Sequence, residues 1–284
     1  MSVDRRSLPV AVFDSGVGGL TVLHECLVSL GHEDFVYLGD TARFPYGSRT
    51  PQELRAFAFE LAEILLARGA KLLVVACNSA TAAALPALRA AVSDRVGVVG
   101  VVTPESALAA RATRTGEVGL LATPATVASR AYERALHEAR SDSRLHAVPC
   151  PDLASLIQSG GGEVDQRLVD AVERACEPLR RVGVDTVILG CTHYPLVRPV
   201  IQRSLGRRVS IISSGQAIVD RVDAELRSRG LSRDEDRRGR YRFLCSGDTE
   251  AFRRLGTRFL QLPLGHVEHV QVGRPREFAA RDAA

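Results

Sequence analysis

Two cysteines, Cys77 and Cys191, occupy matching places in two similar stretches of the sequence. Each stretch consists of a glycine, a hydrophobic run, a small residue, the cysteine and then an amide or hydroxyl residue. The stretches are Gly69–Asn78 and Gly183–Thr192, and the second follows the first by 114 positions. Hydrophobic runs of this length are typical of buried strands. The pattern therefore predicts two similar units, each with a thiol just beyond the carboxyl end of a strand.

Two thiols on opposite sides of one small molecule could invert a stereocentre. A thiolate would remove a proton from one face, a thiol would return a proton to the other, and the roles would reverse for the other enantiomer. A free thiol has a pKa of about 8.5, and its neighbours can lower this value. An α-proton of an amino acid is only weakly acidic, so such a site must stabilise the developing negative charge with preorganised dipoles.

Pyridoxal phosphate would be the alternative route, and it needs a lysine for its Schiff base. The sequence contains one lysine, Lys71, at the start of the strand that leads to Cys77. At about 3.3 Å per residue, the strand separates the two residues by roughly 20 Å. We therefore expect no lysine-bound cofactor. The six cysteines are widely spread and form no Cys-x-x-Cys pair, so we expect neither a disulfide framework nor a structural zinc site.

Several polar residues accompany the thiols. Asp14 and Ser15 open a glycine-rich turn after the first predicted strand, where they could orient an ammonium group or tune Cys77. A plain tight turn would explain the glycines but not this pair. The loop Thr41–Gly47 follows the second strand, and by default such a loop is only a surface connection. His193 lies two residues after Cys191, close enough in sequence to modulate that thiol.

The elements that position these residues alternate between hydrophobic runs and helical patterns, which indicates an α/β fold. The runs are mostly continuous, as in parallel strands covered on both faces. Helix starts are expected at Thr50 and Thr103, each followed by proline. A fainter similarity relates Val10–Ser15 to Val118–Thr123. The predicted strands are Pro9–Phe13, Phe35–Leu38, Lys71–Ala76, Val96–Val101, Glu117–Leu121, Leu145–Val148, Asp185–Leu189, Val209–Ile212 and Tyr241–Cys245.

These patterns predict two pseudo-symmetric, doubly wound lobes with mainly parallel sheets. Ligands bind beyond the carboxyl ends of strands in such sheets, so the active site is expected in the cleft between the lobes.

Composition excludes several classes of protein. The chain has 284 residues, 45% of them hydrophobic, and no uninterrupted apolar run of membrane-spanning length. Its polar start lacks the features of a secretory signal, so a cytoplasmic location is expected. The net charge is only +4, and acidic residues interrupt the basic stretch Arg233–Arg242. We interpret that stretch as a solvated surface loop and expect no nucleic-acid binding.

The chain resembles the glutamate racemases of the aspartate/glutamate racemase superfamily. The resemblance spans nearly the whole chain and rests on six motifs in order. They are FDSGVGGLTV (Phe13–Val22), YLGDTARFPYG (Tyr37–Gly47), ACNSAT (Ala76–Thr81), LATPATVASRAY (Leu121–Tyr132), GCTHYPL (Gly190–Leu196) and GDTEAFRRL (Gly247–Leu255).

The resemblance implies a cofactor-independent racemisation of L- and D-glutamate, in which Cys77 and Cys191 act as acid and base, assisted by Asp14 and His193. It further implies bacterial D-glutamate supply for peptidoglycan synthesis, and a homodimer. The implied substrate contacts are Asp14, Ser15, Pro45, Tyr46, Gly47, Asn78, Ser79, Thr126, Thr192 and His193.

The family fold also implies a discontinuous first lobe. On this basis residues 1–99 and 210–270 form the first lobe, residues 100–209 form an inserted second lobe, and residues 271–284 form a tail.

Two positions depart from the family pattern. Many members carry threonine in place of Ser79, and either residue supplies a hydroxyl group. A glutamate that assists the histidine is expected where Gln158 stands. Because glutamine carries no charge, it could orient His193 but not stabilise its cation. Either Asp152 or Glu163 replaces the missing carboxylate, or the two directions of the reaction differ in rate.

Three other interpretations remain open. A related enzyme could act on aspartate, hydantoins or malonates, although the decarboxylases among these need one cysteine. A binding protein that regulates DNA gyrase belongs to another class, and no residue specifically supports it. A zinc hydrolase using Cys191 and His193 would leave Cys77 without a role.

Overall fold

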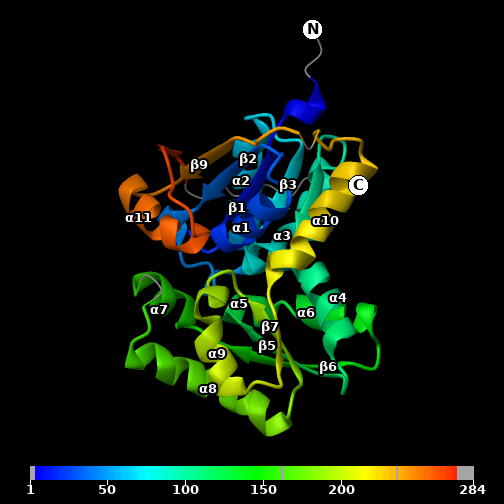
Figure 1. The fold of residues 1–284 in the computed structure, drawn as a ribbon, viewed down its shortest axis with the longest axis vertical. Coiled ribbons are helices and arrows are strands. Elements are labelled where there is room, and N and C mark those ends of the chain that lie inside the picture. Colours follow the sequence, from blue (N-terminus) through cyan, green and yellow to red (C-terminus); the bar gives the residue numbers. More distant parts are fainter. Residues whose placement is uncertain (1–3, 161–162, 235, 274–284) are drawn as a thin grey trace.

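The computed structural model describes residues 4–160, 163–234 and 236–273, which form two lobes with a parallel sheet in each (Figure 1). The strands of the first sheet, in spatial order, are β10 (Val267–His269), β9 (Tyr241–Cys245), β2 (Phe35–Gly39), β1 (Val10–Asp14), β3 (Leu72–Val75) and β4 (Gly97–Gly100). Those of the second are β6 (Arg144–Pro149), β5 (Glu117–Ala122), β7 (Thr186–Gly190) and β8 (Ser210–Ile212).

Every strand pair in the described residues is parallel. The α/β fold and the parallel sheets are therefore confirmed. Each predicted strand is present, with ends that differ by at most one residue. Within the described ranges β10 is the one strand that was missed, because its three residues include a single buried residue, Val267, and show no hydrophobic periodicity.

Helices follow most strands. They are α1 (Leu20–Ser29), α2 (Pro51–Leu66), α3 (Asn78–Val92), α4 (Val102–Ala112), α5 (Pro124–Ala128), α6 (Ala131–Ala139), α7 (Leu153–Ser159), α8 (Gln166–Val182), α9 (Arg198–Leu205), α10 (Ser214–Ser228) and α11 (Thr249–Leu260). Short 3-10 turns lie at Arg5–Ser7, Thr41–Arg43 and Tyr194–Val197.

The two predicted helix starts have different outcomes. Thr50 caps α2 through a reciprocal pair of hydrogen bonds with Glu53, as its sequence pattern predicts. Thr103 does not cap α4, because that helix already begins at Val102 without a side-chain cap.

The internal repeat corresponds to a repeat in topology. The order β2-β1-β3-β4 in the first sheet matches β6-β5-β7-β8 in the second. Strands β3 and β7, which lead to the two cysteines, therefore occupy equivalent places beside the equivalent strands β1 and β5. The carboxyl ends of both sheets face the junction of the lobes, and this arrangement brings Cys77 and Cys191 together.

In the part of the chain that the structure describes, the backbone crosses between the lobes twice, after β4 and after β8. Helix α10 then packs on α1 of the first lobe and on α4 (Figure 1). Strand β8 pairs with β7, so the second sheet extends past residue 209, where the lobe boundary was predicted. The division into lobes at the predicted residues otherwise stays a prediction, and residues 274–284 of the predicted tail lie outside the described part.

Lys71 lies at the amino end of β3, away from the thiols. Its ammonium group is buried in an ion pair with Glu33 at 2.5 Å and bonds to two backbone carbonyls. The basic stretch after α10 is less solvated than predicted, because the guanidinium group of Arg233 is nearly buried against Asp34. Among the described residues, no helix combines the length and the apolar character needed to cross a membrane.

Candidate active site

A small cavity of about 40 Å³ lies where the carboxyl ends of the two sheets meet. Both thiols line it, Cys77 from the first lobe and Cys191 from the second. Ten of the residues predicted for the site contribute to its lining: Ser15, Pro45, Tyr46, Gly47, Cys77, Asn78, Ser79, Cys191, Thr192 and His193. The two remaining candidates, Asp14 and Thr126, lie behind this lining.

Cys77 is the residue before the first turn of α3. Burial raises the pKa of Cys77 to about 12, and the nearby charge of Asp14 adds to this effect. Hydrogen bonds from the backbone of Ala80 and from Ser15 lower the pKa and only partly compensate. Without a ligand the thiol is therefore protonated at neutral pH.

Cys191 is placed similarly at the end of β7, but a 3-10 turn rather than an α-helix follows it. Burial raises its pKa well above the ordinary thiol value, and the backbone N–H of His193 partly offsets this. Charge on Cys77 raises the pKa of Cys191 further. The two sulfurs therefore lie close enough to influence each other's protonation.

His193 connects Cys191 to Gln158. Its Nε2 lies 3.0 Å from Oε1 of Gln158, and its Nδ1 lies 3.9 Å from Sγ of Cys191. Because the amide oxygen only accepts hydrogen bonds, Nε2 carries the proton and Nδ1 is an acceptor that faces the thiol. Burial, to which the rings of Phe44 and Phe259 contribute, lowers the pKa of His193 to about 3.

The contact between Gln158 and His193 contradicts one of the two explanations for Gln158, and a difference in rate between the two directions stays a prediction. Gln158 itself contacts the histidine, whereas Asp152 is exposed and Glu163 pairs with Arg258 on the surface. Neither acidic residue takes the place of the missing carboxylate. His193 is therefore oriented as a neutral base.

Asp14 is fully buried behind the cavity at the end of β1. Its carboxylate accepts hydrogen bonds from the backbone N–H of Gly16 at 3.0 Å and from Oγ1 of Thr192 at 3.2 Å. Burial raises the pKa of Asp14 despite these bonds. Since Thr192 belongs to the second lobe, the carboxylate also links the two lobes.

Three hydroxyl groups form a second link between the lobes. Oγ of Ser79, on α3, lies 2.8 Å from Oγ1 of Thr123 and 3.0 Å from Oγ1 of Thr126, both near α5. Thr123 also lines the cavity and was not among the predicted site residues. A signal was present, because the fainter internal similarity aligns Thr123 with Ser15.

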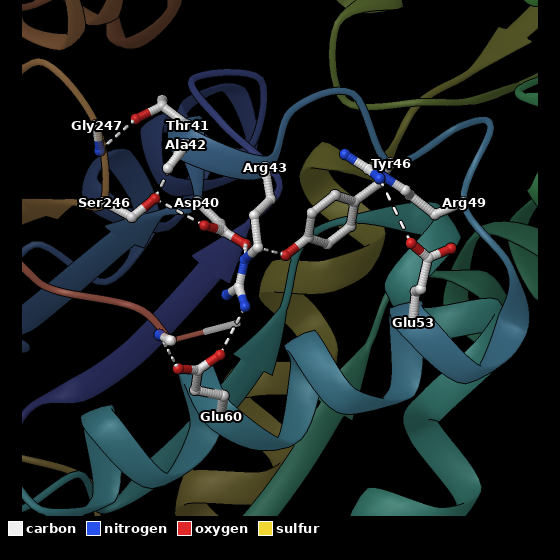
Figure 2. Close-up of polar contacts among 11 residues, drawn as sticks. Asp40, Thr41, Ala42, Arg43, Tyr46, Arg49, Glu53, Glu60, Ser246 and Gly247 are labelled. Atoms are coloured by element: carbon white, nitrogen blue, oxygen red, sulfur yellow. Dashed lines mark hydrogen bonds and ion pairs between the residues drawn. The ribbon is translucent and has the colours of Figure 1, made fainter. Parts of the chain in front are cut away.

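The loop that carries Pro45, Tyr46 and Gly47 is held from behind by a buried polar network (Figure 2). The carboxylate of Asp40 accepts hydrogen bonds from the hydroxyl of Tyr46, from Nε of Arg43 at 2.6 Å and from Ser246 at 2.7 Å. The loop is therefore part of the site and not merely a surface connection.

Arg43 extends this network towards α2. It binds Glu60 at 2.6 Å, and its guanidinium group lies 4.2 Å from the ring centre of Phe57. The charged groups behind the loop are thus paired.

Four further residues line the site and were not predicted individually, although Phe44 lies in the loop that the sequence singles out. Phe44, Ser48, Pro151 and Ala154 complete the lining. Among the described residues, no group of three or more histidine, cysteine or acidic side chains is arranged to hold a metal ion. Cys191 and His193 therefore lack a third protein ligand within that part of the chain.

Comparisons with known proteins agree with this geometry. Residues 20–222 match the model of the Asp/Glu/Hydantoin racemase family. A glutamate racemase of Listeria monocytogenes is 40% identical over 93% of this chain and 98% of its own length.

Two solved structures are similar over almost their full length. The glutamate racemase isoform RacE1 of Bacillus anthracis has a TM-score of 0.87 and 36% identity, covering 93% of this chain and 98% of its own. The glutamate racemase of Francisella tularensis, solved with D-glutamate, has a TM-score of 0.86 and 29% identity, covering 94% and 98%. The chain is thus an amino-acid racemase that belongs to the Asp/Glu/Hydantoin racemase family and, within it, to the glutamate racemases.

Proposed function

We propose that this enzyme interconverts L- and D-glutamate by a two-base mechanism in which Cys77 and Cys191 exchange the roles of base and acid. The observation that carries the proposal is that two thiols from equivalent strands of the two lobes line one cavity. A single substrate carbon held between them would have a sulfur on each face.

One thiolate removes the α-proton, and the electron pair of the broken C–H bond stays on the carbon. The opposite thiol then donates its proton to the other face, so the substrate leaves inverted and the two sulfurs have exchanged protonation states. Backbone N–H groups at the start of α3 and the hydroxyl of Ser79 would stabilise the negative charge that develops on the substrate. Thr126 holds Ser79 from behind, and Thr192 donates to Asp14.

Both thiols are held in the protonated form by burial, so the active thiolate must form when the substrate binds. The substrate ammonium group supplies a positive charge that favours a thiolate. His193, with Nδ1 facing Cys191, is the nearest base for that thiol. Asp14 has the corresponding role for Cys77, whose protonation responds to its charge. Ser15, Pro45, Tyr46, Gly47 and Asn78 would contact the rest of the substrate.

The direct test uses purified protein and L-glutamate with no added cofactor, followed by loss of optical rotation. Rotation should decay to zero with L-glutamate and persist with L-aspartate. Cys77→Ala and Cys191→Ala should each slow the reaction by at least about 100-fold, the scale of general acid–base catalysis. Cys176→Ala, which removes a buried thiol on α8, is the matched control and should keep its activity. Full activity in either single-thiol variant would refute the mechanism.

Single-thiol variants allow a second check of the same idea. Elimination of HCl from 3-chloroglutamate needs only one proton abstraction. Each variant should therefore accept one enantiomer of this compound, and the two variants should accept opposite enantiomers.

We further propose that the product D-glutamate is used for peptidoglycan synthesis, and that the enzyme acts in the cytoplasm as a homodimer. The similarity to bacterial glutamate racemases supports this role. The protein should restore growth of a bacterial strain that requires D-glutamate, and the Cys77→Ala variant should not. Light scattering should give twice the mass of one 30.6 kDa chain.

A further inference from the structure

Glu105 is a fully buried carboxyl group one hydrogen bond away from the residue that follows Cys77. It lies in the first turn of α4, where the two lobes meet (Figure 1). Three side chains from three other helices donate hydrogen bonds to it: Asn78 of α3, Tyr132 of α6 and Ser214 of α10. The proposed chemistry gives this group no role.

The donor and the acceptor of each of these hydrogen bonds can be assigned one after another, starting from Glu105. Above its pKa of about 7 this group is a carboxylate that only accepts, so the hydroxyl of Tyr132 must donate to Oε2 of Glu105. The oxygen of Tyr132 can then accept from Nδ2 of Asn78, which lies 2.6 Å away. The same Nδ2 lies 3.2 Å from Oε2 of Glu105. The amide nitrogen of Asn78 is thus held towards Glu105, and its carbonyl oxygen is turned the other way.

That carbonyl oxygen is an acceptor without a donor. Asn78 lines the cavity between the thiols, and the residue is 2% exposed. Its Oδ1 is buried and has no hydrogen-bond partner among the described residues. Buried polar groups are normally paired, so this oxygen requires a donor from a molecule in the cavity, either a water or a ligand. The ammonium group of an amino acid is such a donor.

We propose that Glu105 is a positioning residue for the substrate ammonium group, because it holds Asn78 with its carbonyl oxygen available to the cavity. The inference rests on the proposed function, since it takes an amino acid as the ligand. It adds a residue from outside the cavity to the determinants of substrate binding.

Glu105→Gln tests the inference with almost no change in shape. The new amide group can donate to Tyr132, which lets the Tyr132 hydroxyl donate to Asn78 and turns the Asn78 amide around. The cavity then presents an N–H donor to the ammonium group. We expect KM for glutamate to rise about 10- to 100-fold, the factor contributed by a hydrogen bond to a charged group, with kcat changed less than about threefold.

Glutarate, which has both carboxylates but no ammonium group, separates this effect from a general loss of structure. Its inhibition constant should change by less than about twofold in Glu105→Gln. Ser214→Ala is the matched control, because it removes a hydrogen bond from the same carboxylate through Oε1, away from Asn78. Its KM and its glutarate inhibition should stay at the wild-type values.

The inference is overturned if Glu105→Gln leaves KM unchanged, or if it weakens glutamate and glutarate equally. Should that variant fail to fold, Tyr132→Phe provides the same comparison, because it removes the shorter of the two hydrogen bonds that hold Nδ2 of Asn78. Its ratio of glutamate to glutarate affinity should fall at least about threefold, and an unchanged ratio overturns the inference. Wild-type protein that does not racemise glutamate would instead refute the proposed function.

Discussion

At the scale of the residue, burial drives the titratable groups of the site towards their neutral forms. It raises the pKa values of Cys77, Cys191 and Asp14 and lowers that of His193. A site built in this way carries little fixed charge of its own. The charge that activates a thiol must then arrive with the substrate, which restricts proton abstraction to the occupied enzyme.

The raised pKa of Glu105 should be visible in the way the free energy of unfolding depends on pH. Burial raises the pKa of Glu105 from 4.5 to about 7, so the folded protein binds this proton more tightly than the unfolded chain does. Its contribution to stability is complete below pH 4.5 and is lost as the pH rises to about 7. Relative to Glu105→Gln, the wild-type protein should lose about 1 kcal/mol of unfolding free energy per pH unit in this range.

Urea unfolding of both proteins at pH 5, 6 and 7 measures this difference. His193 contributes with the opposite sign, because burial lowers its pKa from 6.5 to about 3 and its stabilisation is lost as the pH falls. That contribution is common to both proteins and cancels in the comparison. A difference independent of pH would show that Glu105 titrates normally.

The substitution Gln158→Glu should convert His193 into a group that titrates. A carboxylate beside Nε2 favours the imidazolium ion, so the pKa of His193 should rise from about 3 towards its ordinary value. Nitrogen chemical shifts of the labelled imidazole, followed from pH 4 to 8, measure the change. Gln158→Ala is the control and should leave the histidine neutral throughout. A neutral histidine in the Glu variant as well would contradict the assigned contact.

At the scale of the element, the residues at the ends of strands could be predicted from the sequence. The side chains from other elements that hold them in place could not. Cys77 and Cys191 follow short hydrophobic runs that are typical of buried strands, so their meeting at the sheet edges follows from topology. Glu105 illustrates the opposite case. A glutamate in the first turn of a helix is a common surface feature, and its burial depends on α6 and α10, which come from distant sequence. Phe259 likewise reaches His193 from α11, far along the chain.

The loop between β2 and α2 should depend on the pairing of Asp40 with Arg43 (Figure 2). Arg43→Ala leaves the carboxylate of Asp40 buried without its cation, which should cost about 3–5 kcal/mol of unfolding free energy. It should also raise KM, since the loop carries Tyr46 into the cavity.

Asp40→Asn removes the charge that needs the cation. In the double variant, Arg43→Ala should therefore cost about 2 kcal/mol less than it does alone. Chemical unfolding of the four proteins of this cycle gives the coupling energy. Additive costs would show that the ion pair does not support the loop.

At the scale of the whole molecule, the sequence repeat predicted the arrangement of the lobes but not how tightly they close. Hydrogen bonds join the lobes around the cavity, from Thr21 to the carbonyl of Thr192 at 3.0 Å and from the N–H of Ala125 to Gly47 at 3.0 Å. A buried water needs about 10–15 Å³, so a cavity of about 40 Å³ holds only a few waters. We therefore expect glutamate to enter when the lobes are further apart.

Closure of the two lobes should be most sensitive to substitution of Gly18, in the turn after β1. A Cβ atom there would lie 2.4 Å from Nδ1 of His193 and 2.4 Å from Oγ1 of Thr192, both on the opposite lobe. Gly18→Ala should hold the lobes apart and lower kcat/KM by at least about 100-fold, since a misplacement of about 1 Å costs that much. Each lobe should keep its own fold.

Small-angle scattering and thermal unfolding distinguish separation of the lobes from unfolding of a lobe. The variant should be larger than the wild-type protein in the presence of glutamate and should still unfold in a cooperative transition. Gly265→Ala is the control, because a Cβ atom there meets nothing within 4 Å, and it should behave as wild type. Wild-type kcat/KM in Gly18→Ala would mean that the chemistry proceeds without this closed contact, so that the two thiols act across a wider gap than the structure shows.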